Sequence, residues 1–77
     1  MSQPFSDLTP AAVYAIKVKG TLSAEWSEWF DGMLLCQDAQ GNTILTGQVV
    51  DQAALYGLLD KVRDLGLLLL AVTKLNE

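Results

Sequence analysis

The sequence predicts an α+β domain: a four-stranded, mainly antiparallel sheet with one long helix on one face and a short aromatic helix. Three patterns indicate it: an alternating strand near the start, a hairpin pattern over residues 33–49, and a helical stripe followed by an apolar run. The element order is that of a ferredoxin-like split β-α-β sheet. If the aromatic segment is a corner rather than a crossover, the same elements form a β-β-β-α-β meander.

The first predicted strand covers residues 13–19, VYAIKVK, where apolar and polar positions alternate as in a half-buried strand. Tyr14, Ile16 and Val18 point to one face, and Ala15, Lys17 and Lys19 to the other. Residues 1–12 contain two prolines and read as an irregular N-terminal arm. A chain of 77 residues has room for one domain, which we place at residues 13–77.

The aromatic segment covers residues 22–33, LSAEWSEWFDGM. Its apolar residues have the spacing of one face of a helix, with Ser23 as the N-cap and Asp31-Gly32 as the end. We therefore expect a helix of about two turns that buries both tryptophans against the core. The alternative is an aromatic binding patch that faces the solvent. The residues that share the face are Leu22, Trp26, Trp29, Phe30 and Met33.

A hairpin is predicted from residues 33–37 and 43–49, joined by a turn at residues 38–42. Gly41 and Asn42 are expected to supply positive φ angles. Gly47, inside the second strand, indicates a bulge or a close approach of the backbone. Cys36 lies in the first strand and is expected to be a small buried apolar residue.

The long helix begins after Asp51, a good N-cap, and ends before Gly66, placed as the C′ residue of a Schellman motif. Gly57 in its middle suggests close packing against another element. The following residues 67–75, LLLLAVTKL, have the pattern of a strand covered on both faces. The stripe that faces the core consists of Leu55, Leu58, Leu59, Val62 and Leu65.

Composition excludes several function classes. The net charge of −4 argues against a nucleic-acid surface, and the absence of histidine removes the usual general base. One cysteine excludes an intrachain disulfide and a cysteine metal cluster, and no phosphate-binding loop is present. The longest apolar run is far shorter than the roughly 20 residues of a membrane span. We expect a non-catalytic, cytoplasmic protein without a cofactor.

The hydrophobic fraction of 51% against a charged fraction of 18% leaves more apolar surface than a small core can hold. We therefore expect a homo-oligomer, with a dimer favoured, that uses the sheet face away from the long helix or the aromatic helix. An unidentified protein partner and a small-molecule-binding regulatory domain of ACT-like or ferredoxin-like type are the alternatives. The candidate interface or ligand-contact residues are Trp26, Trp29, Tyr56 and Arg63. Arg63 is also spaced to pair with Asp60.

Two stretches resemble a family of small bacterial proteins without an assigned function. They are YAIKVKGTLSAEWSEWFDGM and TGQVVDQAALYGLLDKVRDLGLLLLAV, which carry the patterns SxxWxxWF and VDQAALxGLLxxxRDLG. The resemblance covers residues 13–75 and implies a bacterial origin and a small α+β fold. It implies no catalytic residue, cofactor or binding site. Tyr56 departs from the pattern, because the family more often has histidine there, and this weakens any role in proton transfer.

Overall fold

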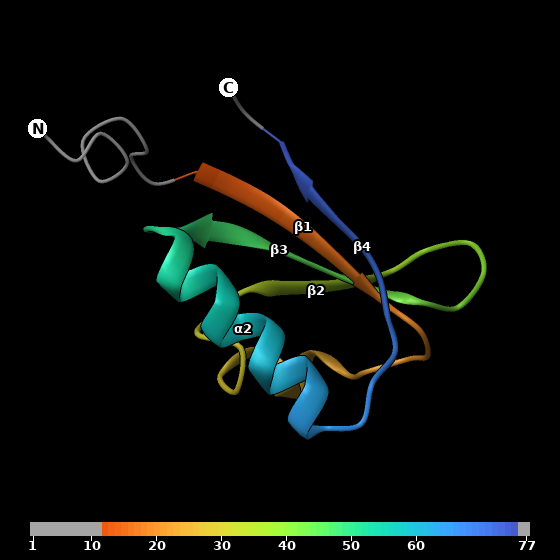
Figure 1. The fold of residues 1–77 in the computed structure, drawn as a ribbon. Coiled ribbons are helices and arrows are strands. Elements are labelled where there is room, and N and C mark those ends of the chain that lie inside the picture. Colours follow the sequence, from red (N-terminus) through yellow and green to blue (C-terminus); the bar gives the residue numbers. More distant parts are fainter. Residues whose placement is uncertain (1–11, 76–77) are drawn as a thin grey trace, which may run out of the picture.

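The computed structural model describes residues 12–75, which form a four-stranded antiparallel sheet with one α-helix (Figure 1). In chain order the elements are β1 (Ala12–Val18), the 3₁₀ turn η1 (Ala24–Ser27), β2 (Leu34–Gln37), β3 (Thr43–Val49), α2 (Gln52–Asp64) and β4 (Leu69–Lys74). The predicted α+β class is confirmed. Ala12, which we placed in the N-terminal arm, is the first residue of β1, and residues 1–11 of that predicted arm lie outside the described residues.

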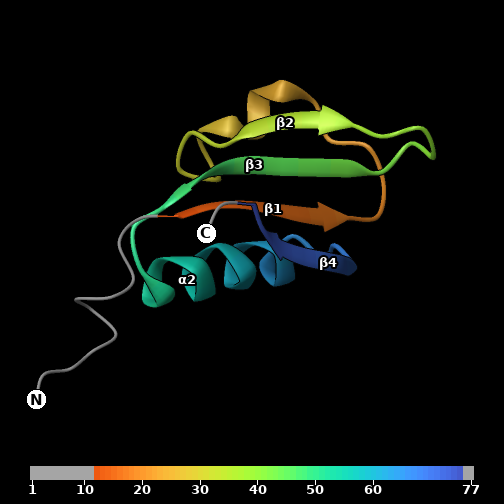
Figure 2. The same ribbon diagram turned by 90° about the horizontal axis from the view of Figure 1, so that it is seen from above.

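The strands lie side by side in the order β2-β3-β1-β4 (Figure 2). β1 is antiparallel to both of its neighbours, with Ile16 opposite Leu45 of β3 and opposite Val72 of β4. The first strand therefore pairs with the third and the fourth strands rather than with the second. This order is not that of the meander, in which β1 would lie beside β2.

The predicted hairpin joins β2 and β3, with Leu35 opposite Leu45. In its turn Gly41 has a φ of 81°, whereas Asn42 does not have a positive φ, so only half of that prediction was right. Gly47 is confirmed as a close backbone approach, because a Cβ there would lie 3.1 Å from Cγ of Met33. A side chain at residue 47 would therefore push on a buried methionine.

Both predicted ends of α2 are confirmed. The Asp51 side chain accepts a hydrogen bond of 2.8 Å from the backbone N–H of Ala54. At the other end, the N–H of Gly66 bonds to the Arg63 carbonyl and the N–H of Leu67 to the Val62 carbonyl. These two bonds are those of a Schellman motif, which needs the positive φ of 74° that Gly66 adopts.

The core lies between α2 and the sheet. Ile16 of β1, Leu45 of β3, Leu58 of α2 and Phe30 of the aromatic segment are all buried in it. The full buried cluster consists of Ile16, Val18, Phe30, Met33, Leu35, Leu45, Val49, Leu58 and Val62. Every element except η1 and β4 contributes to this cluster, so the last strand is joined to the fold mainly through its ladder with β1.

The predicted aromatic helix was wrong. Only Ala24–Ser27 is helical, it is a 3₁₀ turn, and Ser23 makes no side-chain cap bond. Most of the bonds that follow close turns of three residues, such as Phe30 to Ser27 and Met33 to Phe30, although the Phe30 N–H also reaches the Trp26 carbonyl. With three residues per turn Phe30 and Met33 lie inside, whereas Trp26 and Trp29 share a separate side and are 38% and 41% exposed. The core is therefore closed by a phenylalanine and a methionine rather than by tryptophans.

Three further predictions about burial were wrong. β4 is exposed at every residue instead of covered on both faces, because it is an edge strand that α2 does not cover. Cys36 is an exposed free thiol, since Leu35 takes the core-facing position of β2. Gly57 lies on the exposed side of α2, where a Cβ would meet nothing within 4 Å, so its presence reflects no close packing in this chain.

Candidate functional site

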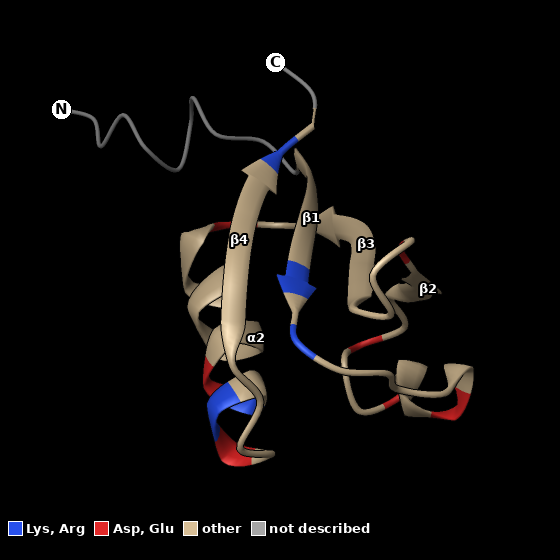
Figure 3. Ribbon diagram, turned by 90° about the vertical axis from the view of Figure 1, so that its right-hand side faces the viewer, with Lys and Arg blue, Asp and Glu red and all other residues tan. Residues whose placement is uncertain are grey.

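The edge of the sheet formed by β4, which we call the β4 edge, is the most apolar exposed part of the described chain. Figure 3 faces this strand and shows no charged segment along it before its last residue, Lys74. Of the ten exposed large apolar side chains in residues 12–75, half lie between Leu68 and Leu75. These five are Leu68, Leu69, Leu70, Val72 and Leu75. Exposed apolar side chains gathered in one place are typical of interaction surfaces.

The width of α2 explains why β4 stays uncovered. An α-helix with its side chains is about 10 Å across, whereas adjacent strands lie about 4.8 Å apart. One helix therefore covers about two strands, here β1 and β3 at the centre of the sheet. On the β2 side the aromatic segment supplies Phe30 and Met33 as further cover. No described element does the same on the β4 side.

The backbone of β4 leaves hydrogen-bonding groups free at this edge. Leu75 donates its N–H to the Val13 carbonyl over 2.7 Å. The direction of the backbone hydrogen bonds alternates from residue to residue along an antiparallel strand. The N–H and C=O groups of Thr73 and Ala71 therefore also point to β1, whereas those of Val72 and Lys74 point to the free edge. β4 thus presents apolar side chains together with a row of backbone donors and acceptors.

A bulge marks the start of β4. Lys17 pairs with Ala71, but Val18 pairs with Leu69, so Leu70 is an extra residue between two rungs of the ladder. Beyond the bulge, residues 71–74 pair regularly with β1. The part of the edge that has strand geometry suitable for a further strand is therefore centred near Val72.

Tyr56 and Arg63, two of the predicted contact residues, lie on the side of α2 away from Lys61. The position of Lys61 fixes this orientation, since its ammonium group reaches Asp31 in the aromatic segment, on the opposite side. At 3.6 residues per turn, Tyr56 and Arg63 lie about 140–160° around the helix from Lys61. Both are exposed, and Arg63 is held by Asp60 at 3.5 Å, as its spacing predicted.

The other two predicted residues, Trp26 and Trp29, form a separate cluster. Their rings meet edge to face, with centroids 6.4 Å apart and an angle of 88°. The Lys61 ammonium lies 5.8 Å from the centre of the Trp29 ring and 3.0 Å from the Asp31 carboxylate. An exposed cation–π contact is worth about 0.5–1 kcal/mol. Lys61 therefore ties the aromatic segment to α2, which gives the cluster a structural role.

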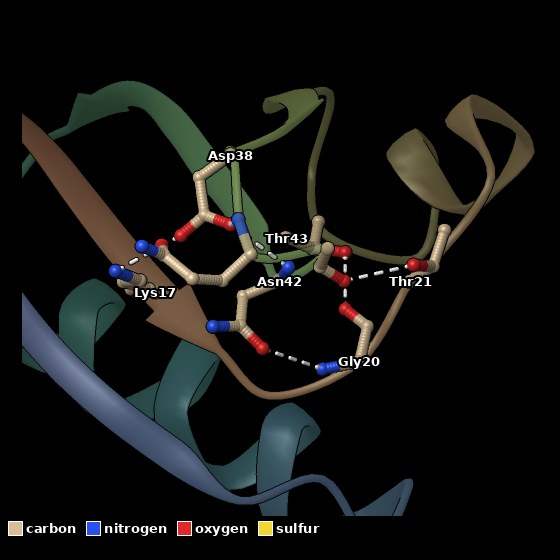
Figure 4. A network of polar contacts seen from close by, with 8 residues as sticks. Lys17, Gly20, Thr21, Asp38, Asn42 and Thr43 are labelled. Carbon is tan, nitrogen blue, oxygen red and sulfur yellow. Dashed lines mark hydrogen bonds and ion pairs between the residues drawn. The ribbon is translucent and has the colours of Figure 1, made fainter.

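A third polar cluster joins the loop after β1 to the β2–β3 turn (Figure 4). The buried Thr43 hydroxyl donates to the Gly20 carbonyl over 2.7 Å and accepts from the N–H of Leu22. Asp38 accepts two backbone N–H bonds of its own turn and pairs with Lys17 at 2.9 Å. The contact with Lys17, followed by these backbone bonds, lowers the pKa of the Asp38 carboxyl. The contacts of this cluster join the loop after β1 to the β2–β3 turn, and the buried Asp38 Oδ2 is held by Lys17, so the cluster positions these loops.

Two searches of the described residues bear on other kinds of site. Within residues 12–75, no three cysteine, aspartate or glutamate side chains gather as a group that could hold a metal ion. Over the same residues, no helix is long and apolar enough to cross a membrane.

The structure thus separates the four predicted residues into two pairs and adds a surface that we did not predict. Trp26 and Trp29 belong to the aromatic cluster, and Tyr56 and Arg63 lie exposed on α2, on the side away from Lys61. The signal for that edge was present in the leucine run of residues 67–70, which we assigned to a covered strand. One amphipathic helix is too narrow to cover four strands, but which strand stays uncovered depends on the strand order, which the structure supplies.

Comparison with known proteins adds the family. Residues 13–73 match DUF8691, a domain of unknown function, over most of the chain. The chain belongs to this family. Among curated proteins and solved structures there is no significant match. The predicted membership of a family without an assigned function is therefore confirmed, and the family brings no activity or site residue with it.

Proposed function

We propose that the protein is a non-catalytic interaction module that works as a homo-oligomer, with a dimer as the basic assembly. The observation that carries the proposal is the β4 edge, where a strand of Leu69–Lys74 is exposed at every residue. Burying such apolar side chains contributes about 25 cal/mol for each Å² removed from water. Closed two-fold dimers are the commonest soluble assemblies, and they place the same surface of both copies in contact.

The sheet face away from α2, one of the two interfaces that we first expected, is less suited to it. Along β1 and β3 this face carries Lys17, Thr46 and Gln48 beside the apolar Val13, Ala15 and Ile44. Lys17 is already paired with Asp38 across the sheet. The apolar excess of the composition is thus concentrated at one edge instead of spread over that face, which supports association through β4.

The proposal includes a finer description of the fold. We assign the sheet to the ferredoxin-like split β-α-β type, because the first strand lies between the third and the fourth. The aromatic segment then occupies the place of the first crossover helix. The loss of that helix leaves one helix for four strands, and this connects the fold with the uncovered edge. An exposed thiol at Cys36 fits a reducing compartment, and we propose the cytoplasm.

Light scattering coupled to gel filtration tests the proposal on the full chain at micromolar concentration. We expect twice the 8.4 kDa of one chain, with dissociation on dilution. A mass of one chain that stays unchanged over a tenfold increase in concentration contradicts the proposal, and a heterologous protein partner then becomes the better explanation of the β4 edge. The protein carries a net charge of −4, so the measurement is made at moderate salt to screen repulsion between copies.

A further inference from the structure

We propose that two copies join edge to edge, with their β4 strands antiparallel and Val72 at the two-fold axis. Four strands from each copy then form one continuous eight-stranded sheet. This inference rests on the proposed self-association and adds the surface, the pairing and the register.

The backbone of β4 is ready for this pairing. The N–H and C=O groups of Val72 and Lys74 point to the free edge, as the bond from Leu75 to Val13 requires. Natural sheets protect exposed edges with prolines, central charges or a covering element. Residues 69–73, LLAVT, contain no proline and no charge, and no described element covers them. The free edge of β4 is therefore unprotected and can form backbone hydrogen bonds with another β-strand.

An axis at Val72 makes the edge complementary to itself. Val72 lies opposite the second copy's Val72 and exchanges both backbone hydrogen bonds with it. Lys74 lies opposite Leu70 of the second copy, so that its aliphatic stem covers the leucine and its ammonium group stays in solvent. The pair Val72–Val72 is apolar, and the two lysines are at opposite ends of the interface. Lys74 is the one charged residue of β4, and in this register the Lys74 side chains of the two subunits therefore lie far apart.

Charge favours the same arrangement. Tyr14, which packs against the core, lies opposite Lys74, so the lysine side chain is on the face that carries α2. In the dimer each Lys74 approaches the start of the other β4, next to the C-terminal end of the other α2. At that end Asp60 and Asp64 are balanced by Arg63 and Lys61, and Lys61 is directed to Asp31 on the far side of the helix, so the attraction for Lys74 comes mainly from the negative end of the helix dipole.

Neighbouring registers fit less well. An axis at Thr73 brings the two Lys74 residues to diagonal positions about 7–8 Å apart and leaves Leu70 outside the contact. An axis at Ala71 sets Lys74 opposite Leu68, whose carbonyl already accepts the N–H of Lys19. Only the axis at Val72 pairs the regular part of the strand while separating the two charges.

The opposite edge of the sheet supplies a matched control. Leu34 of β2 is 64% exposed, more than Leu69, Leu70 or Val72 of β4, and it also belongs to an edge strand. We compare Val72→Lys with Leu34→Lys by light scattering, after circular dichroism has shown that both variants keep the native fold. We expect Val72→Lys to raise the dimer dissociation constant at least tenfold and Leu34→Lys to leave it within twofold.

Disulfide trapping tests the register without a new charge. In a Cys36→Ser background, Val72→Cys is oxidised at low micromolar concentration beside Thr73→Cys. Residues at the axis of an antiparallel pair have Cα atoms about 5.5 Å apart, within reach of a disulfide, whereas the Thr73 positions are beyond the limit of about 7 Å. We expect most of the Val72→Cys chains and few of the Thr73→Cys chains to link.

The outcomes separate this inference from the proposed function. A dimer that survives Val72→Lys but dissociates with Leu34→Lys, or one whose Val72→Cys form does not link, keeps self-association and overturns the β4 pairing. A single-chain mass for the unmodified protein overturns both. Dissociation by Val72→Lys alone, together with efficient linking at residue 72, supports the edge-to-edge dimer.

Discussion

Leu58 of α2 anchors the helix on the sheet, and its replacement by alanine is the sharpest test of the fold. The side chain is 3% exposed and belongs to the core cluster, whereas its neighbour Leu59 is only partly buried at the margin. Removal of three carbon groups costs about 0.8 kcal/mol each, or about 2.4 kcal/mol in all. The remaining cavity raises the loss to about 3–4 kcal/mol. For Leu59→Ala we expect about 1–1.5 kcal/mol, since part of that side chain stays in solvent.

Urea unfolding followed by far-UV circular dichroism measures both losses. A domain of 77 residues has a total unfolding free energy of about 4–12 kcal/mol, so Leu58→Ala removes between about a quarter and nearly all of it. Both variants are measured at one protein concentration, because association adds to the apparent stability. If Leu59→Ala costs as much as Leu58→Ala, or more, then α2 is rotated on the sheet and the assignment of its buried face is wrong.

Three further predictions concern single residues. Phe30→Ala lowers the unfolding free energy by about 3–5 kcal/mol, whereas Trp29→Ala, which removes a partly exposed ring, costs less than half as much in the same urea experiment. Gly57→Ala raises stability by about 1 kcal/mol, since its position in α2 is open, and a loss would show an undetected contact. Because the pKa of Asp38 is lowered in the folded state, its contribution to the free energy of unfolding is complete above its unfolded-state pKa and is lost as the pH falls through its folded-state pKa. The Asp38→Asn side chain does not titrate, so we expect this variant to lose less stability than the unmodified protein when the pH is lowered through that range.

Local signals predicted the parts of the fold that depend on local rules. Asp51 and Gly66 mark the ends of α2 because a cap and a Schellman motif are made within one turn of the helix. Gly41 marks the hairpin turn for the same reason. The alternation in residues 13–19 predicted the strand observed as Ala12–Val18 and its core face, since side chains of a strand point alternately to its two sides.

The wrong predictions concern features that depend on the number of residues per helical turn or on which element packs against a segment. Trp26 and Trp29 fit a helix of 3.6 residues per turn, but the segment winds with three, and this moves them away from Phe30. The apolar run in residues 69–74 indicates that the strand is buried, but it does not indicate which element covers it. No element of the described chain does so. The β4 edge, as a candidate site, therefore became visible only with the order of the strands.

The place of β1 between β3 and β4 has a consequence for how the chain acquires its structure. The pairs of Tyr14 with Lys74 and Ile16 with Val72 join positions 60 and 56 apart. During synthesis, one side of the first strand therefore stays bare until residues 69–74 have left the ribosome. Until then β1 is an unpaired edge strand in the nascent protein, and the apolar leucine segment that follows α2 is prone to aggregation. Pairing of β4 with β1 removes the free edge of β1 and orders the leucine segment in the same step. Slower translation or a lower growth temperature gives the chain more time for this pairing and therefore favours the yield of soluble protein.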